Sequence, residues 1–157
     1  MEKKTVSVVM CTYNGERFLR EQMDSILAQT YPIHEIIISD DCSTDGTMDI
    51  LREYAAKHTF IKIHQNARNK GCNQNFHDTF KFVSKETDYI AISDQDDIWF
   101  PEKVEKLVQS IEKKKGYDLC FSDIISSPTC SHQQTSHCLS PQSLCFLETI
   151  YRGTPCL

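Results

Sequence analysis

Three aspartates, Asp94, Asp96 and Asp97, fall within four consecutive positions of segment 89–105, which reads YIAISDQDDIWFPEKVE. Carboxylates crowded in a short loop, with no basic residue between them, repel one another unless a cation shares the site. Carboxylate oxygens suit Mg²⁺ and Mn²⁺, and these ions usually complete their coordination shell with substrate phosphates. The cluster therefore predicts a divalent-metal site that works together with a phosphorylated ligand.

Two other interpretations of the acidic cluster are weaker. A calcium-binding EF-hand loop counted from Asp94 fails, because Trp99 stands at the sixth position, where glycine is required. Alternatively, Asp97 caps a helix that begins after Pro101, and the other aspartates are merely solvated. Capping explains only one of the carboxylates, so we favour the metal site.

A second acidic pair, Asp40 and Asp41, follows the apolar run 35–39. An acid at the end of a strand suits hydrogen bonding to a nucleoside, as it does in dinucleotide-binding folds. The first turn, CTYNGERF, contains Gly15 alone, so it matches neither the Gly-x-Gly-x-x-Gly fingerprint nor a P-loop. NAD-dependent enzymes and ATPases are therefore disfavoured. A sugar-nucleotide pyrophosphorylase is disfavoured as well, because it needs a Gly-rich basic loop here.

The elements that must position these residues alternate along the chain. Continuous apolar runs predict strands at 5–11, 35–39, 60–64, 89–93 and 117–122, and apolar residues at helical spacing lie between them. We expect Asn14 to cap the first helix and Ser43 or Thr44 to cap the second. The alternation predicts an α/β fold, a mostly parallel sheet with helices on both faces.

The polar loops that follow the predicted strands share a composition rich in Asp, Asn and Gly. Ligands of such sheets bind beyond the carboxyl ends of the strands. We therefore expect these loops to converge on one crevice. The loops are TYNG, DDCSTDGT, NARNKG and SDQDD.

Composition sets wider bounds. The 157 residues make one domain's worth of chain, and the net charge of −5 argues against a nucleic-acid partner. No apolar run approaches the ~20 residues of a membrane helix, and the start, MEKKTVSVVM, does not resemble a signal peptide. We expect no transmembrane segment, a cytoplasmic location, and free thiols for the eight cysteines.

The string VSVVMCTYNGERFLREQMDSILAQTYPIHEIIISDDCSTDGT, with NKG and SDQDD behind it, resembles the family 2 inverting glycosyltransferases over about residues 5–123. The resemblance implies a GT-A fold, whose first half is a Rossmann-like unit that binds a nucleotide-sugar. Asp94-Gln95-Asp96 matches the Asp-x-Asp motif of that family. Asp96 would hold the Mn²⁺ or Mg²⁺ ion that bridges the diphosphate, and Asp94 would contact the ribose or the ion and its water.

The resemblance also implies a set of donor-binding residues. Thr12 and Tyr13 would line the base pocket, and Asp41, with Asp40 beside it, would bond the base or ribose. Arg68 or Lys70 would offset phosphate charge. The full implied set is Thr12, Tyr13, Asn14, Asp40, Asp41, Arg68, Lys70 and Asp94.

The implied activity is sugar transfer from a UDP- or dTDP-sugar to a saccharide or lipid-linked acceptor in cell-surface polysaccharide synthesis. SDQDDIW further resembles a subgroup linked to rhamnose-type transfers. The acceptor hydroxyl would displace the nucleoside diphosphate directly, assisted by a carboxylate base in the second half of the domain. A lipid-linked acceptor would place the protein peripherally at the inner membrane face, as an alternative to free residence in the cytoplasm.

The resemblance stops near residue 125. Residues 126–157 are rich in Cys, Ser and Pro, and Glu148 is their only acidic side chain. We expect residues 1–125 to form an incomplete nucleotide-sugar-binding domain, and 126–157 to form a poorly ordered tail that leaves one sheet edge unpaired. Either the subfamily is divergent or shortened, or a shifted reading frame near residue 125 yields a truncated, non-catalytic remnant that still binds the donor. We favour the second explanation, because periodicity, charge and motif vanish together.

Overall fold

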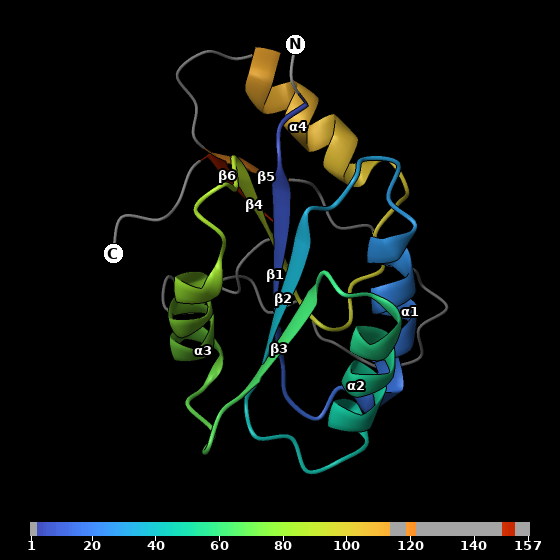
Figure 1. The fold of residues 1–157 in the computed structure, drawn as a ribbon, viewed down its shortest axis with the longest axis vertical. Helices are drawn as coiled ribbons and strands as arrows, with labels where there is room; N and C mark the ends of the chain where they lie inside the picture. Colours follow the sequence, from blue (N-terminus) through green and yellow to red (C-terminus); the bar gives the residue numbers. More distant parts are fainter. Residues whose placement is uncertain (1–2, 114–118, 122–148, 153–157) are drawn as a thin grey trace, which may run out of the picture.

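The computed structural model describes residues 3–113, 119–121 and 149–152, which form one sheet flanked by helices (Figure 1). The sheet has six strands in the order β3-β2-β1-β4-β6-β5. The strands are β1 (Val6–Thr12), β2 (Glu35–Asp40), β3 (Ile61–Gln65), β4 (Tyr89–Ser93), β5 (Leu119–Phe121) and β6 (Thr149–Arg152). The helices are α1 (Glu16–Leu27), α2 (Thr47–Lys57), α3 (Cys72–Thr79) and α4 (Lys103–Lys113), with a short 3₁₀ helix, η1 (Phe80–Phe82).

The first four strands are parallel, with β1 in the middle. β1 pairs with β2 on one side and with β4 on the other, and β2 pairs with β3. Every residue of β1, β2 and β4 is buried. Strands covered on both faces need apolar residues at nearly every position, which is why their sequences are continuous rather than alternating. The predicted α/β fold with a mostly parallel sheet is confirmed.

Helices cover both faces of this sheet (Figure 1). On one face Val8 of β1 belongs to a hydrophobic cluster with residues of α1, α2 and α4. On the other face Val9 belongs to a second cluster that contains Phe76 of α3. Successive side chains of a strand point to opposite faces, so one strand supplies both clusters and holds the two helical layers in register.

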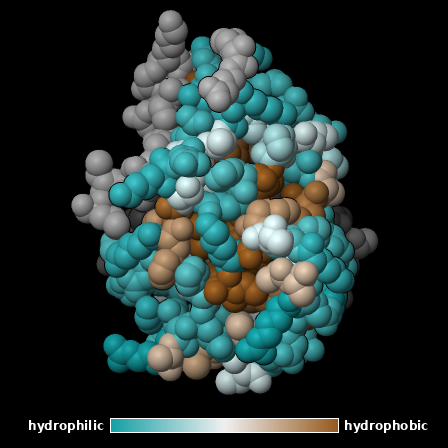
Figure 2. Space-filling view, in the orientation of Figure 1, coloured by the Kyte–Doolittle hydropathy of each residue, from teal (hydrophilic) through white to brown (hydrophobic). Residues whose placement is uncertain are grey.

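The edge strand β3 is less covered than its neighbours. Ile61 is buried, whereas Lys62 and Gln65 are exposed. In the orientation of Figure 1, hydrophobic residues gather near the middle of the visible face of the molecule, and hydrophilic residues surround them (Figure 2). Exposed polar side chains on an edge strand discourage pairing with another chain.

The outer edge of β4 is paired, so among the described strands the open edge on this side of the sheet is that of β5. β6 runs antiparallel to β4, and β5 runs antiparallel to β6. An open strand edge presents unpaired N–H and C=O groups, and residues 149–152, within the predicted tail, satisfy these groups of β4. The rest of the tail, including Glu148, lies outside the described residues.

The prediction that Asn14 and Ser43 or Thr44 cap the first two helices is wrong, because these residues form hydrogen bonds between loops instead. α1 begins after Gly15 and α2 begins after Gly46. Asn14 adopts a positive φ of 48°, and its Oδ1 accepts a hydrogen bond from the backbone N–H of Thr44 at 2.8 Å. The N–H of Thr47, the first residue of α2, donates to Asp45 Oδ1 at 3.0 Å.

The layer beneath α3 gives a stability test. Phe76 is fully buried and belongs to the cluster on that face. Phe76→Ala is expected to lower the free energy of unfolding by about 3–5 kcal/mol, because it leaves a cavity against the sheet. Urea denaturation measures the loss. Phe100→Ala is the matched control, since Phe100 is 64% exposed, and a loss of equal size there would contradict the assignment.

Candidate functional site

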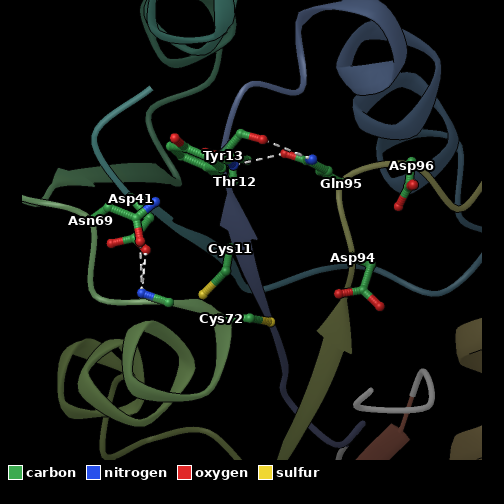
Figure 3. A pocket seen from close by; sticks show the side chains of 10 residues that line it. Cys11, Thr12, Tyr13, Asp41, Asn69, Cys72, Asp94, Gln95 and Asp96 are labelled. Carbon is green, nitrogen blue, oxygen red and sulfur yellow. Dashed lines mark hydrogen bonds between the residues drawn. The ribbon is translucent and has the colours of Figure 1, made fainter. Parts of the chain in front are cut away.

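A cavity of about 400 Å³ opens at the carboxyl ends of the parallel strands (Figure 3). All four predicted loops contribute side chains or backbone to its lining, so the predicted crevice is confirmed. Cys11 in its wall is a cysteine without a disulfide. The lining residues are Cys11, Thr12, Tyr13, Asp41, Asn69, Gly71, Cys72, Asp94, Gln95 and Asp96.

Asp41 is held firmly at one end of this cavity. Its side chain is almost fully buried. Its Oδ1 accepts hydrogen bonds from Asn66 Nδ2 at 2.9 Å and from the backbone N–H of Lys70 at 2.9 Å. Its Oδ2 accepts one from the N–H of Gly71 at 2.8 Å. Hydrogen bonds to a charged acceptor are among the stronger ones, so the loop after β3 fixes this carboxylate in place.

Asp40, the neighbour of Asp41, lies outside the cavity lining. Asp40 is fully buried, and it accepts hydrogen bonds from Thr12 Oγ1 at 3.0 Å and from the N–H of Ser43 at 2.9 Å. Ser43 Oγ donates to it as well. The structure therefore separates the acidic pair. Asp41 faces the cavity, whereas Asp40 joins the loops after β1 and β2.

The three remaining donor-binding candidates also lie outside the lining. Lys70 Nζ forms an ion pair with Asp78 at 3.0 Å, and Arg68 is exposed. Hydrogen bonds from Lys81 and Lys70 hold the pKa of the Asp78 carboxyl well below its usual range. The third candidate, Asn14, bonds the loop after β2. Only the backbone of Lys70 reaches the site, through Asp41.

The acid loop, Asp94 to Asp97, forms the opposite end of the cavity. Asp94 and Asp96 belong to the lining, with Gln95 between them (Figure 3). Burial, followed by repulsion from Asp97 and Asp96, raises the pKa of Asp94 to about 6, and the charge of Lys103 only partly opposes this. Burial, and then Asp96, likewise raises the pKa of Asp97. The protein alone thus stabilises these negative charges incompletely.

The interpretation of Asp97 as a helix cap is not supported. In the first turn of α4, the N–H of Val104 donates to Gln29 Oε1 at 3.0 Å, and the N–H of Lys103 donates to the carbonyl of Phe100.

The side chain of Lys103 is the basic group that faces the acid loop. Its Nζ lies 4.5 Å from the centroid of the Trp99 ring. Burial lowers the pKa of Lys103 to about 7, against the attraction of Asp97 and then Asp94.

The family model for glycosyl transferase family 2 matches residues 7–149. The chain is a member of glycosyl transferase family 2. The matched range includes β6 as far as Thr149, and so extends past the end of the resemblance noted in the sequence.

Two bacterial relatives illustrate the family match. The chain is 43% identical over 115 residues to EpsE of Bacillus subtilis (strain 168), whose name assigns it to the glycosyltransferases; the match covers 73% of this chain and 41% of EpsE. It is 40% identical over 105 residues to the dTDP-rhamnosyl transferase RfbG of Shigella flexneri, covering 65% of this chain and 36% of RfbG. The chain thus spans less than half the length of either relative.

Solved structures show the same GT-A fold. S. aureus TarS 1-349 in complex with UDP-GlcNAc superposes with a TM-score of 0.73 at 22% identity, covering 94% of this chain and 45% of that one. The mannosyltransferase PcManGT from Pyrobaculum calidifontis, in complex with GDP-Man and Mn²⁺, has a TM-score of 0.66 at 21% identity, covering 76% and 35%. Within the part of the chain that the structure describes, no helix is long and apolar enough to cross a membrane.

The acid loop of this family 2 member suits a metal ion whose coordination shell is completed by a bound ligand. Among the described residues, no group of three or more His, Cys, Asp and Glu side chains could hold a metal by itself. Mg²⁺ usually binds through one or two carboxylates and takes further ligands from phosphates and water. Asp94 and Asp96 supply that number of carboxylates at the cavity wall, so the donor set suits such an ion.

Sequence reasoning missed a support beneath the acid loop. Gln22 of α1 is fully buried, and its Nε2 donates to Ser93 Oγ at 2.6 Å. Ser93 Oγ in turn donates to the carbonyl of Asp94 at 2.9 Å. A glutamine on the apolar face of α1, between Leu19 and Met23, is the signal that could have identified this support.

The electrostatics of the acid loop predict that the charge of Asp94 destabilises the folded protein when no metal is bound. Asp94→Asn is expected to stabilise the metal-free protein, since the folded pKa of Asp94 is about 6 and that of an unfolded aspartate is about 3.9. Ionisation therefore costs the folded state progressively between about pH 4 and pH 6. The gain should be absent below about pH 4 and on the order of 3 kcal/mol above about pH 6, because each pKa unit corresponds to about 1.4 kcal/mol.

Urea denaturation in EDTA across this pH range measures the effect. Asp49→Asn controls for the loss of one negative charge, because the Asp49 side chain is 80% exposed. An Asp94→Asn effect that did not change with pH would show that burial and the neighbouring acids do not perturb this carboxyl.

Proposed function

We propose that this chain binds the nucleotide-sugar donor of a metal-dependent inverting glycosyltransferase, through a donor unit within residues 1–125. The observation that carries the proposal is the cavity that has Asp41 at one end and Asp94 with Asp96 at the other. A nucleoside would occupy the first end and a metal-bound diphosphate the second. We propose a UDP- or dTDP-sugar as the donor, in line with the names and ligands of RfbG and TarS.

The nucleoside end offers an acceptor and a platform. Asp41 would accept a hydrogen bond from the base or ribose, and its own donors from the protein keep it in position. Tyr13 lines the cavity and is 48% exposed, so its ring is available to stack against a base. Thr12 also lines the cavity, and its hydroxyl donates a hydrogen bond to Asp40.

The diphosphate end would use Asp94 and Asp96 to hold Mn²⁺ or Mg²⁺. Such an ion stabilises the negative charge that develops on the leaving diphosphate. In the transfer itself, the acceptor oxygen would bond to the anomeric carbon, the bond from that carbon to the diphosphate would break, and a base would take the hydroxyl proton. We assign no described residue as that base.

The acceptor would be a saccharide or a lipid-linked saccharide of cell-surface polysaccharide synthesis. A second candidate function is donor binding without transfer. The cavity lining favours this second function. Its acidic side chains are Asp41, Asp94 and Asp96, and each would already bind the donor or its metal, so none of them is left to act as the base. Lack of a general base typically slows transfer by about 10²–10⁴-fold. A radiolabelled-donor assay separates the two functions, and robust acceptor-dependent product would support the transferase.

Metal dependence is the first expected property. UDP or dTDP should bind about tenfold or more tightly with Mn²⁺ than in EDTA, a difference of about 1.4 kcal/mol or more. Asp96→Ala should remove that difference, because it deletes one proposed ligand. Titration calorimetry measures both affinities, with Asp49→Ala as an exposed acidic control. Equal UDP affinity in Mn²⁺ and in EDTA for the unsubstituted chain would refute the metal-dependent donor site.

The nucleoside role of Asp41 is tested separately. Asp41→Asn should weaken uridine and UDP by similar factors, about tenfold or more, because a hydrogen bond to a charged group contributes about 1.5–3 kcal/mol. In Mn²⁺, Asp96→Ala should weaken UDP. In EDTA, where no ion is present, it should leave uridine unchanged, since uridine carries no phosphate. A loss confined to UDP in Asp41→Asn would contradict the nucleoside assignment. Thermal unfolding checks that each variant is folded.

A further inference from the structure

Gln95 lies between the two acids of the Asp-x-Asp motif, yet its side chain turns to the opposite loop. Its Oε1 accepts a hydrogen bond from the backbone N–H of Tyr13 at 2.9 Å, and its Nε2 donates to the carbonyl of Tyr13 at 3.1 Å (Figure 3). One carboxamide thus pairs with both backbone groups of a single residue, as a neighbouring strand would. Two bonds fix the orientation of Tyr13 as well as its distance from the acid loop.

Gly15 provides independent evidence that this contact is built in. A Cβ atom added at Gly15 would lie 2.3 Å from Gln95 Oε1 and 2.7 Å from its Cδ. Real Cβ atoms do not approach other atoms this closely. The Gln95 carboxamide therefore packs against the backbone of residue 15, and any side chain larger than hydrogen would displace it from Tyr13.

The loop that Gln95 holds is anchored on its other side as well. The N–H of Asn14 donates to Ser43 Oγ at 2.9 Å, and the N–H of Gly15 donates to Thr47 Oγ1 at 2.8 Å. Asn14 and Gly15 are thus bonded to the segment after β2 and to the first residue of α2. The two bonds of Gln95 to Tyr13 join the acid loop to this assembly.

We propose that Gln95 is a positioning residue that couples the nucleoside end of the donor site to its metal end, an inference that rests on the proposed function. An ion that orders Asp94 and Asp96 also orders Gln95 between them. Through its two hydrogen bonds Gln95 then orders Tyr13, against which the base would lie. A ligand that binds an already ordered loop loses less conformational entropy, so the two ligands bind cooperatively.

The carboxamide is suited to this role by its charge and its two functions. It adds no negative charge to the acid loop, and it offers both the acceptor and the donor that the backbone of Tyr13 needs. Cooperativity is reciprocal at equilibrium. Mn²⁺ should therefore tighten the binding of uridine, which has no phosphate for the ion to contact, and uridine should tighten Mn²⁺ by the same factor.

The decisive experiment measures this factor in the full chain. Titration calorimetry gives the uridine affinity in saturating Mn²⁺ and in EDTA, and the Mn²⁺ signal in electron paramagnetic resonance gives the reciprocal effect. For the unsubstituted chain we expect coupling of about fivefold. Gln95→Ala and Gly15→Ala should each abolish this coupling. The double variant should show no further loss, because both substitutions disrupt the same contact between Gln95 and Tyr13.

Gly46→Ala is the matched control. A Cβ at Gly46 would lie 2.7 Å from the carboxylate of Glu16, the first residue of α1. This variant therefore crowds a side chain next to Gly15 without touching Gln95, and it should keep the coupling. Thermal unfolding confirms that each variant is folded. Amide exchange at Tyr13 should become faster in Gln95→Ala and in Gly15→Ala.

The outcomes distinguish this inference from the proposed function. Absence of Mn²⁺-dependent UDP binding in the unsubstituted chain would overturn both. Metal-dependent UDP binding with a uridine affinity indifferent to Mn²⁺, or with coupling retained in Gln95→Ala, would overturn the role of Gln95 alone. A purely structural contact would lower the unfolding temperature and leave the coupling unchanged, which also overturns the role.

Discussion

Two adjacent buried carboxylates at the end of β2 determine how the loops of the site are arranged. Asp40 and Asp41 are 0% and 3% exposed, and a buried carboxylate is stable only when donors from the protein replace its water. Asp40 takes its donors from Thr12 and Ser43. Asp41 takes its donors from the loop after β3. Three loops are thereby drawn together, and the cavity forms where they meet.

The acid loop after β4 follows a different principle. There, neighbouring carboxylates share a partly buried position, and burial raises the pKa of Asp94 and lowers that of Lys103. The protein satisfies the charges at one end of the cavity with its own donors and satisfies those at the other end only in part. Sites of this kind cost stability in the absence of the ligand, and the structure supports the loop through Gln22 and Ser93.

The sheet makes both ends possible, because its parallel register brings strand ends to one line. Thr12 of β1 stands opposite Asp40 of β2, and Met10 stands opposite Ser93 of β4. Asp41 and Asp94 therefore follow directly after paired positions of rigid strands. Residues placed in this way are held more precisely than residues in the middle of a long loop. Gln95 then needs only one side-chain length to bridge from the acid loop to Tyr13.

The sequence by itself determined the scaffold and the location of the site. Strands buried on both faces need apolar residues at nearly every position, so β2 and β4 were predicted to within one residue. Because parallel strands direct their carboxyl ends to one edge, the convergence of the polar loops followed as well. The clustering of Asp94, Asp96 and Asp97 also marked the acidic end of the cavity, because repulsion within a short segment is a local property.

Only the tertiary structure decided which polar groups satisfy one another. Asn14 bonds Thr44 instead of capping α1, Gln29 occupies the helix end predicted for Asp97, and residues 149–152 pair with β4. Lys70 pairs with Asp78, and Asp40 turns away from the cavity. Most of these contacts join residues far apart in the chain. A side chain's local sequence states its hydrogen-bonding capacity, but the partner is whichever group the packed strands and helices bring within reach.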